Sequence, residues 1–380
     1  MIQDLSIVPS LLKIPYPILA LAAFSIAAIV SFYAYPVIIY VAHRKQLMDI
    51  PGERSVHQKR VPTLGGVGVF FGFCITMTFL GFAMPSLQLI SLLGSLTLLF
   101  FMGMKDDLLV LSPRKKFVIQ LIAALHVILI TDVHVNSFFG LFGAHTLPYW
   151  VSVVFSLFVF VLIINAYNLI DGVDGLAGSI GLTTSVFFAI FFVINGNQSL
   201  ALISLALIGT IGAFLFYNFS NKRKIFMGDT GSMLIGFLLA FQAISFLKEQ
   251  SGIPEYHLPN APVFVLAVLS FPLIDTLRVF LVRFLKGQSP FTADKNHIHH
   301  QLLLLGLKHW QITVVVALFG ASVVGVAFAT ASLNIHWHLL AVMIYAVLVG
   351  LTPFFVTIKS EKVKLLKPKP LLKKNTKNAV

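Results

Sequence analysis

The residues best suited to chemistry lie in one stretch, NAYNLIDGVDGLAGS at 165–179, which interrupts a run of apolar residues. Two asparagines and two aspartates recur in it every three residues, so neighbouring members share one face of a helix, and the glycines let that helix bend or end. Carboxylate and amide oxygens hold Mg²⁺ in proteins together with substrate phosphates. The stretch therefore predicts a metal centre that handles phosphate, the alternative being a polar helix cap before a glycine-rich turn. The four residues are Asn165, Asn168, Asp171 and Asp174.

Two further acidic positions lie beside basic residues. Asp106 and Asp107 precede a basic run that ends at Lys116, and Asp229 follows a basic loop at the start of an apolar run. A carboxylate at the first position can accept the proton of a phosphate monoester, whose second pKa is about 6. The free N–H groups of a helix start beside Asp229 can bind phosphate. The alternatives are acids that only balance nearby bases, and an ordinary N-cap at Asp229.

Three histidines occur within four positions, at His297, His299 and His300, shortly after Lys295. Their density suggests zinc, but no cysteine or acid pair nearby completes a structural zinc site. We interpret them instead as hydrogen-bonding groups for a pyrophosphate or a sugar.

Two other polar positions are open to a structural interpretation. His57 lies in a basic loop whose charges can attract a nucleotide phosphate or anionic lipid, or can simply anchor the chain. Asp275 and Arg278 are three residues apart within an apolar run, and we expect them to form an internal ion pair, with a catalytic role as the alternative.

The composition predicts an all-α polytopic membrane protein. Hydrophobic residues make up 58% of the chain and charged residues 11%, whereas soluble globular proteins carry more charge and less apolar content. Runs of apolar residues predict about eleven transmembrane helices. The only cysteine, Cys74, excludes an intramolecular disulfide. The predicted helices cover roughly 16–42, 63–83, 88–104, 117–133, 148–168, 177–194, 199–217, 231–247, 261–284, 311–332 and 336–357.

The distribution of Lys and Arg predicts the orientation of these helices. Alternating the sides of the membrane gathers nearly all of the basic residues on one side, so the N-terminus is expected outside and the C-terminus in the cytoplasm. The net charge of +13 thus indicates membrane lipid, not nucleic acid, as a partner. We expect a single transmembrane catalytic domain over 1–358 and a disordered basic tail over 359–380. The predicted cytosolic loops are 43–62, 105–116, 169–176, 218–230 and 285–310.

In this topology the acidic positions all lie toward the cytosolic side, and none lies near the bilayer centre. Ion-coupled transporters place ionisable residues near the midplane. The arrangement favours an enzyme that joins a water-soluble, nucleotide-activated group to a membrane-bound acceptor. A secondary transporter of an anionic solute is the alternative.

Taken together, the motifs resemble the polyprenyl-phosphate N-acetylhexosamine-1-phosphate transferases of glycosyltransferase family 4. The resemblance runs from about His43 to Leu307 and is specific in its combination and order. Within this family the chain resembles the WecA- and TagO-type branch. The related peptidoglycan enzyme MraY typically has three consecutive histidines, and Ile298 interrupts such a triplet here. The motifs are His57 with PTLGG at 62–66, the pair Asp106 and Asp107, NAYNLIDGVDG at 165–175, FMGDTGS at 226–232 and HIHH at 297–300.

The resemblance implies transfer of a sugar 1-phosphate from a UDP-N-acetylhexosamine, with N-acetylglucosamine as the expected sugar, to undecaprenyl phosphate. UMP is released, and the step initiates a cell-envelope polysaccharide such as lipopolysaccharide. The resemblance also implies Mg²⁺, with Mn²⁺ as a substitute, and a bacterial plasma membrane location with the site facing the cytoplasm. A homodimer remains open.

The resemblance assigns roles to individual positions. Asp229 and Asn168 contact the metal, and Asp106 or Asp107 activates the lipid phosphate. Asp171 and Asp174 belong to the catalytic set, and Asp174 also helps to place the uridine end of the donor. The substrate-binding residues expected are His57, Lys116, Asn165, Asn218, Lys295, His297, His299 and His300, of which Lys116 and His299 hold phosphates and Asn218 lies at the uridine end.

Overall fold

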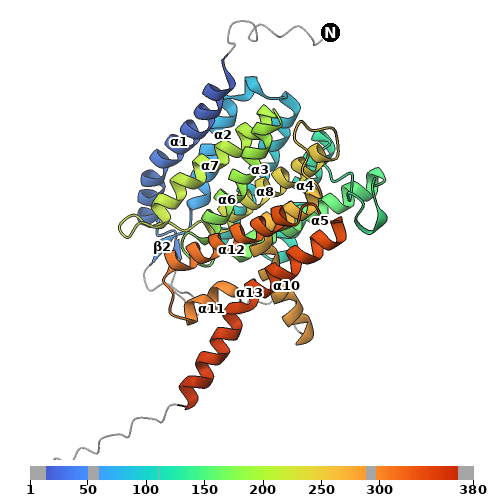
Figure 1. Cartoon of the computed structure of the whole chain (residues 1–380). Coiled ribbons are helices and arrows are strands. Elements are labelled where there is room, and N and C mark those ends of the chain that lie inside the picture. Colours follow the sequence, from blue (N-terminus) through green and yellow to red (C-terminus); the bar gives the residue numbers. More distant parts are fainter. Residues whose placement is uncertain (1–13, 50–59, 110, 288–296, 367–380) are drawn as a thin grey trace, which may run out of the picture.

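The computed structural model describes residues 14–49, 60–109, 111–287 and 297–366, and these are mostly helical (Figure 1). The elements in the first half of the chain are α1 (Tyr16–Lys45), β1 (Met48–Asp49), β2 (Val61–Pro62), α2 (Gly65–Phe79), η1 (Gly81–Ala83), α3 (Ser86–Leu109), α4 (Pro113–Thr131), η2 (Leu141–Gly143) and α5 (Tyr149–Leu169). Those in the second half are α6 (Leu176–Ile194), α7 (Gln198–Asn218), α8 (Gly228–Gln250), α9 (Ala261–Val268), α10 (Ser270–Leu285), α11 (Ile298–Leu304), α12 (His309–Ala329) and α13 (Ile335–Leu366).

Eight of the described helices are long and apolar enough to cross a membrane, and the bent pair α9 and α10 meets the same criteria when the two are joined. The chain is therefore an all-α polytopic membrane protein, as the composition predicts. The expected count of eleven also needs α2, which has 15 residues, and α4, which begins with three basic residues. That count and the orientation of the termini stay predictions. The eight helices are α1, α3, α5, α6, α7, α8, α12 and α13.

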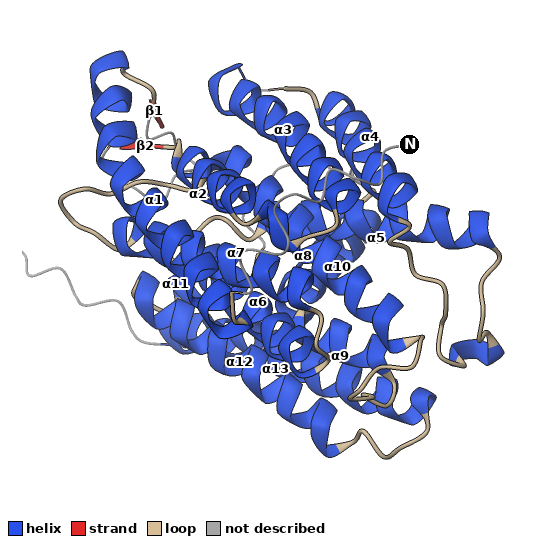
Figure 2. Cartoon of the chain, turned by 90° about the horizontal axis from the view of Figure 1, so that it is seen from above, coloured by secondary structure: helices blue, strands red, loops and turns tan. Residues whose placement is uncertain are grey.

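Helix α8 is the central element of the bundle (Figures 1 and 2). Its most apolar 18-residue stretch is completely buried inside the protein, whereas only 17% of the corresponding stretch of α13 is buried. Helices α2, α3, α5 and α6 all pack against it. A helix that is apolar on every side is stable only when it is covered on every side. The chain therefore places Asp229, in the first turn of α8, on its most enclosed helix.

A short backbone ladder fixes the start of α8. Strands β1 and β2 pair antiparallel, and the segment after β2 then pairs with the residues that precede α8. The N–H of Phe226 donates to the carbonyl of Pro62 at 2.8 Å, and the N–H groups of Gly65 and Gly66 donate to the carbonyls of Phe226 and Met227 at 2.9 Å. The predicted cytosolic segments 43–62 and 218–230 are thus joined beside the site.

The span predicted at 261–284 is not one continuous helix. The structure divides it at Leu269 into α9 and α10, whose axes differ by 76°. Pro272 explains the break, because it lacks the N–H that would donate to the carbonyl of Val268 and its ring crowds that carbonyl. Helix α10 therefore leaves the direction of α9, and α10 and α11 lie together at the lower end of the bundle beside α13 (Figure 1).

The predicted disordered tail begins too early in the sequence. Helix α13 continues to Leu366, past the expected tail start at Lys359. A helix that is already nucleated extends at little cost through residues such as Glu and Lys, which are good helix formers. The rest of the expected tail, 367–380, lies outside the described residues.

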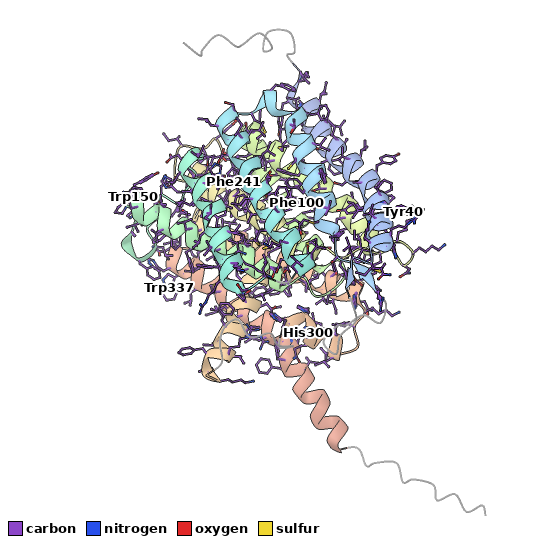
Figure 3. All side chains as sticks on the ribbon, turned by 180° about the vertical axis from the view of Figure 1, so that it is seen from behind. Tyr40, Phe100, Trp150, Phe241, His300 and Trp337 are labelled. Carbon is purple, nitrogen blue, oxygen red and sulfur yellow. The ribbon has the colours of Figure 1, made fainter. Side chains whose placement is uncertain are left out.

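Exposed aromatic residues mark two sides of the bundle. Trp150 at the start of α5 and Trp337 at the start of α13 lie on one flank, and Tyr40 near the end of α1 lies on the opposite flank (Figure 3). His300 lies apart from all three, at the lower end.

Candidate active site

Asp229 is the meeting point of three helices. Its Oδ2 accepts a hydrogen bond from Nζ of Lys116 at 2.7 Å, and its Oδ1 accepts one from Nδ2 of Asn168 at 2.9 Å. Lys116 belongs to the first turns of α4, and Asn168 to the last turn of α5. The side chain of Asp229 is 34% exposed, so its carboxylate remains open to a ligand.

Asp107 caps α8 from the neighbouring helix α3. Its Oδ1 accepts a hydrogen bond from the N–H of Asp229 at 2.7 Å. Its Oδ2 accepts from the N–H of Thr230 at 3.1 Å and from Oγ1 of Thr230 at 2.5 Å. The first N–H groups of a helix have no partner within the helix, and a carboxylate there also interacts favourably with the helix dipole. Both oxygens of Asp107 therefore serve to hold Asp229 in place.

The oxygens of Asp106 are also occupied by contacts within the protein. It forms an ion pair with Lys116, and its Oδ1 accepts a hydrogen bond from the N–H of Leu111 at 2.6 Å. Its side chain is only 1% exposed. The ammonium of Lys116 thus bridges Asp106 and Asp229, and it neutralises part of the negative charge between α3 and α8.

Glycines allow these helices to approach closely enough for such contacts. A Cβ atom at Gly66 in α2 would lie 2.2 Å from the backbone nitrogen of Gly231, and one at Gly103 in α3 would lie 2.5 Å from the Cα of Thr230. Real Cβ atoms do not approach other atoms so closely. The glycines therefore set the distance at which Asp107 reaches the first turn of α8.

Asp171 lies in the loop between α5 and α6. Burial, together with the negative charges of Asp229, Asp107 and Asp174, raises the pKa of Asp171 to about 8. Among the described residues nothing donates a hydrogen bond to its carboxylate. Without a cation nearby, this acid is therefore mostly protonated at neutral pH.

Asp174, in the same loop, is held firmly by two bases. Its Oδ2 lies 2.5 Å from Nζ of Lys224 and 2.6 Å from Nδ1 of His309. Burial alone would raise the pKa of Asp174, but the hydrogen bonds from His309 and Lys224 bring it below its usual range. Thr313, one turn along α12, also donates to the carbonyl of Asp174 at 3.1 Å. The end of the loop is therefore fixed to α12.

The asparagines Asn165 and Asn218 make hydrogen bonds inside the protein. Nδ2 of Asn165 donates to Oε1 of Gln120 at 2.7 Å. Oδ1 of Asn218 accepts from the N–H of Gly175 at 2.6 Å, and its Nδ2 donates to the carbonyl of Ile225 at 2.8 Å. These contacts support the loop and the approach to α8. Direct contact of either asparagine with substrate stays a prediction.

The histidines lie beside the loop between α5 and α6 that carries Asp171 and Asp174, which we call the acidic loop. His299 is buried at the start of α11 and packs on Gly172, where a Cβ atom would lie 2.6 Å from its Nε2. Burial, with a smaller contribution from His300, lowers the pKa of His299 to about 3, so its ring is neutral. The ring of His300 lies 4.4 Å from that of His299. The other two candidates, His57 and Lys295, lie outside the described residues.

Several functional contacts were not predicted from the sequence. Lys224 and His309 hold Asp174, and Gln120 holds Asn165. Lys224 was visible only as part of a basic loop, and His309 only as a polar residue before an apolar run. Gln120 is a single amide in an apolar helix. Such a residue in a membrane span usually forms a hydrogen bond with another helix, so its presence could have indicated this contact.

The donor set suits a divalent cation that is completed by substrate. Among the described side chains, no three His, Cys, Asp or Glu residues are arranged to hold a metal ion by themselves. Mg²⁺ however needs only one or two carboxylates when phosphates and water supply the remaining ligands. Asp229 is partly exposed, and Asn168 uses its Nδ2 for hydrogen bonds, which leaves its Oδ1 without one among the described residues. The pKa of Asp171 is raised by burial first, and the negative charges of Asp229, Asp107 and Asp174 add to the effect.

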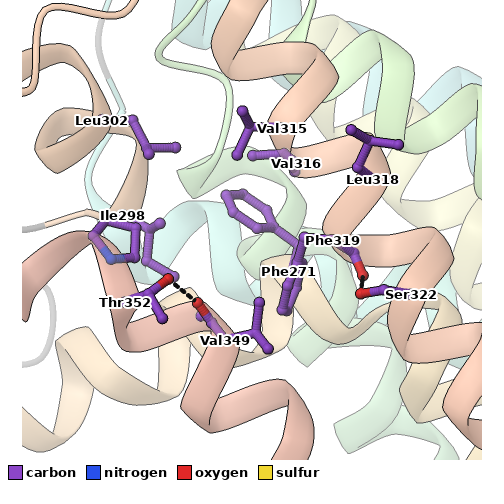
Figure 4. Close-up of a pocket in the computed structure, with 12 residues that line it drawn as sticks. Phe271, Ile298, Leu302, Val315, Val316, Leu318, Phe319, Ser322, Val349 and Thr352 are labelled. Carbon is purple, nitrogen blue, oxygen red and sulfur yellow. Dashed lines mark hydrogen bonds between the residues drawn. The ribbon is translucent and has the colours of Figure 1, made fainter. Parts of the chain in front are cut away.

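An apolar pocket of about 260 Å³ lies beside the histidines, between α10, α11, α12 and α13 (Figure 4). Ile298 and Leu302 of α11 point into it from one side, and Phe271, Val316 and Phe319 close the other. Because α11 carries the histidines on its other face, the pocket adjoins the polar site directly.

Known proteins match most of the chain. The model of the family described as Glycosyl transferase family 4 matches residues 89–247. An undecaprenyl-phosphate alpha-N-acetylglucosaminyl 1-phosphate transferase of Yersinia pestis is 31% identical, over 81% of this chain and 84% of its own length. The protein of the same name from Escherichia coli strain K12 is 29% identical, over 74% of this chain and 76% of its own.

A relative from Bacillus subtilis strain 168 is named a probable undecaprenyl-phosphate N-acetylglucosaminyl 1-phosphate transferase. It is 30% identical, over 78% of this chain and 81% of its own length. The similarity thus extends well beyond the residues that the family model matches and covers the helices that carry Lys116, Asn168 and Asp229. The resemblance found in the motifs is confirmed, and the chain belongs to glycosyl transferase family 4.

Proposed function

We propose that this protein transfers N-acetylglucosamine 1-phosphate from UDP-N-acetylglucosamine to undecaprenyl phosphate and releases UMP. The observation that carries the proposal is the convergence of Asp107, Lys116, Asn168 and Asp229 from four helices at the start of the central helix α8. Relatives named for this reaction support it, and a transporter does not fit them. The product, undecaprenyl-pyrophosphoryl-N-acetylglucosamine, initiates a cell-envelope polysaccharide.

The reaction exchanges one phosphoanhydride for another. An oxygen of the lipid phosphate attacks the sugar-bearing β-phosphorus of the donor, a new P–O bond forms, and the bond from that phosphorus to the bridging oxygen breaks. The electron pair of the broken bond leaves with UMP. Catalysis of such a transfer is mainly positioning and charge stabilisation. Lys116 supplies a cation beside Asp229, and the neutral His299 offers a hydrogen-bonding ring beside the acidic loop.

Asp171 is our candidate for the group that accepts the proton of the lipid phosphate. The oxygens of Asp106 and Asp107 are already engaged by Lys116, Leu111 and the first turn of α8, so these two acids are better suited to positioning. Asp171 has no such partner among the described residues, and a bound cation would bring its pKa down from about 8, so that its carboxylate would be free to accept a proton.

We propose Mg²⁺ as the cofactor, held by Asp229 and by Oδ1 of Asn168, with Mn²⁺ as a substitute. When bound, the ion would neutralise the pyrophosphate as its bridging bond weakens. The protein supplies the rest: Asp107 fixes the backbone that carries Asp229, and Lys116 limits the repulsion between Asp229 and Asp106.

The lipid acceptor would reach this site from the bilayer. The apolar pocket lined by Ile298, Leu302 and Phe319 adjoins the histidine face of α11 and suits hydrocarbon. The basic residues next to Asp106 and Asp229 support a site on the cytoplasmic side of a bacterial plasma membrane.

Incubation of the purified protein with UDP-N-acetylglucosamine, undecaprenyl phosphate and Mg²⁺ tests the proposal. We expect UMP release that requires the lipid, and a lipid product whose mass has increased by one N-acetylglucosamine phosphate. A panel of other UDP-sugars serves as the control for donor identity. If no donor in the panel gives UMP release that depends on the lipid, the proposal is contradicted.

A further inference from the structure

Asp275 in α10 is a fully buried carboxylate outside the group around Asp229. Its Oδ2 lies 2.7 Å from Nδ1 of His297, and its Oδ1 accepts a hydrogen bond from the N–H of Ile298 at 2.8 Å. An ionised carboxylate only accepts, so an ionised Asp275 requires that Nδ1 of His297 carries the proton between them. The partner expected from the sequence, Arg278, instead has its guanidinium 3.8 Å from the ring centre of Phe354.

The ring of His297 in turn packs against the ring of His299. The two rings are stacked, with centroids 5.4 Å apart and planes that differ by 11°. Nδ1 of His299 is buried and has no hydrogen-bond partner among the described residues. The orientation of this ring therefore depends on packing against His297, His300 and Gly172. Gly172 adjoins Asp171, so the contacts run from Asp275 to the acidic loop.

We propose that Asp275 is a positioning residue, which fixes the ring of His297 and the first turn of α11 and so holds His299 against the loop that carries Asp171. This inference rests on the proposed function, in which His299 offers a hydrogen-bonding ring to the substrate beside the acidic loop. The bond to Ile298 adds a second effect, because the side chain of Ile298 lines the apolar pocket. One carboxylate thus sets the polar and the apolar face of α11 together.

A buried charge is an expensive way to join two helices, since apolar residues of similar volume would serve stability as well or better. The advantage of a buried carboxylate over apolar residues is that its hydrogen bonds are directional. A carboxylate that accepts from a ring nitrogen and from a backbone N–H one residue later fixes both the tautomer and the rotation of the ring, as oriented histidines require.

Steady-state kinetics with UDP-N-acetylglucosamine test the proposal in three variants of the full chain. Asp275→Asn keeps the side-chain volume but turns an acceptor into a donor, and His297→Phe keeps the ring but loses the bond. Asp132→Asn is the matched control, because Asp132 pairs with Lys248 and His134 at the other ends of α4 and α8. We expect kcat/KM to fall about 10- to 100-fold in the first two and to stay unchanged in the control.

The double variant separates positioning from general stabilisation. If Asp275 acts through His297, adding Asp275→Asn to His297→Phe causes no further loss of kcat/KM. Independent, multiplying losses would overturn the proposal, and so would wild-type kinetics in Asp275→Asn. Should Asp275→Asn not yield folded protein, His297→Phe alone decides, and wild-type kinetics there would overturn the proposal equally.

Hydrogen exchange gives a readout that does not depend on the reaction. We expect the amides of α11 to exchange at least tenfold faster in Asp275→Asn than in wild type or Asp132→Asn, because the bond to Ile298 is weakened. If the wild-type protein releases no UMP with any donor, the proposed function fails, and exchange alone then decides on Asp275. Unchanged exchange in α11 would overturn its positioning role.

Discussion

The hydrogen bonds of Asp107 separate a structural from a chemical role for this acid. Replacing it with alanine removes three acceptor contacts with the first turn of α8. Loss of an N-cap costs about 0.5–2 kcal/mol, and a hydrogen bond to a charged group contributes about 1.5–3 kcal/mol. We therefore expect Asp107→Ala to destabilise the protein by roughly 2–4 kcal/mol, since the contacts are not additive.

Two milder variants make this a graded test. In Asp107→Asn the amide nitrogen faces a backbone N–H, so one donor of the first turn loses its acceptor at a cost of about 1.5–3 kcal/mol. Thr230→Val removes only the hydroxyl contact and should cost about 1.5 kcal/mol, the low end of the range for a charged acceptor, because Oδ2 of Asp107 keeps its bond from the N–H of Thr230. Stability should thus decrease from wild type through Thr230→Val and Asp107→Asn to Asp107→Ala.

Thermal unfolding in detergent and lipid-dependent UMP release measure the two consequences side by side. Asp229 lies in the turn that loses its cap, and a displacement of about 1 Å can cost a hundredfold in rate. We expect activity to fall in the same order as the unfolding temperature. An Asp107→Asn protein with wild-type thermal stability and more than a thousandfold loss of activity would refute this reasoning and assign Asp107 to the chemistry itself.

Three further predictions concern the neighbouring residues. Lys116→Gln should lower UMP release at least tenfold and also lower the Mg²⁺ concentration for half-maximal rate, because Asp106 and Asp229 lose their shared cation and then attract a divalent ion more strongly. In metal-free protein the unfolding temperature should fall as pH rises from about 4 to 8, because the raised pKa of Asp171 means that the folded state holds a proton that the unfolded state releases, and Asp171→Asn should flatten this dependence in thermal scans. Gly66→Ala should prevent stable folding, as size-exclusion chromatography would show, whereas Gly212→Ala should be tolerated because no atom lies within 4 Å of its added methyl group.

The sequence predicts which residues gather at the site better than it predicts what they contact. Asn168 and Asp229 were both expected beside one ion, and a hydrogen bond of 2.9 Å joins them across 61 positions of chain. The family resemblance implied this pairing, and the glycines and acids at the ends of apolar runs indicated that both residues lie at helix ends.

Contacts between helices could not be predicted in the same way. Nothing in the local sequence of Asp107 indicates that it caps a helix more than a hundred positions away, and nothing near Asp174 points to His309. Such pairs depend on how the helices rotate and on how closely they approach. The break at Leu269 was in principle visible, because Pro272 marks it, but the apolar run continues through it without interruption.

The charge of the site implies that the donor and a divalent cation bind together. Asp106 and Asp229 share the ammonium of Lys116, and the carboxyl groups of Asp107 and Asp171 lie close to Asp229, so a pyrophosphate would enter a negative environment. Two unit charges 4 Å apart repel by about 4 kcal/mol at an effective dielectric constant of 20, which corresponds to roughly a thousandfold in affinity.

We therefore expect UDP-N-acetylglucosamine to bind at least a hundredfold more weakly in EDTA than with Mg²⁺, and calorimetry on the detergent-solubilised protein would measure the difference. Linkage requires the reverse effect of equal size, so the donor must tighten Mg²⁺ binding by the same factor. Asp229→Asn removes one negative charge and one oxygen ligand, so it should weaken donor binding with Mg²⁺ while improving it in EDTA. Equal donor affinity with and without the ion in the wild-type protein would mean that the acids do not face the pyrophosphate, and the positions assigned to Asp171 and Asp229 around the reacting phosphorus would then be untenable.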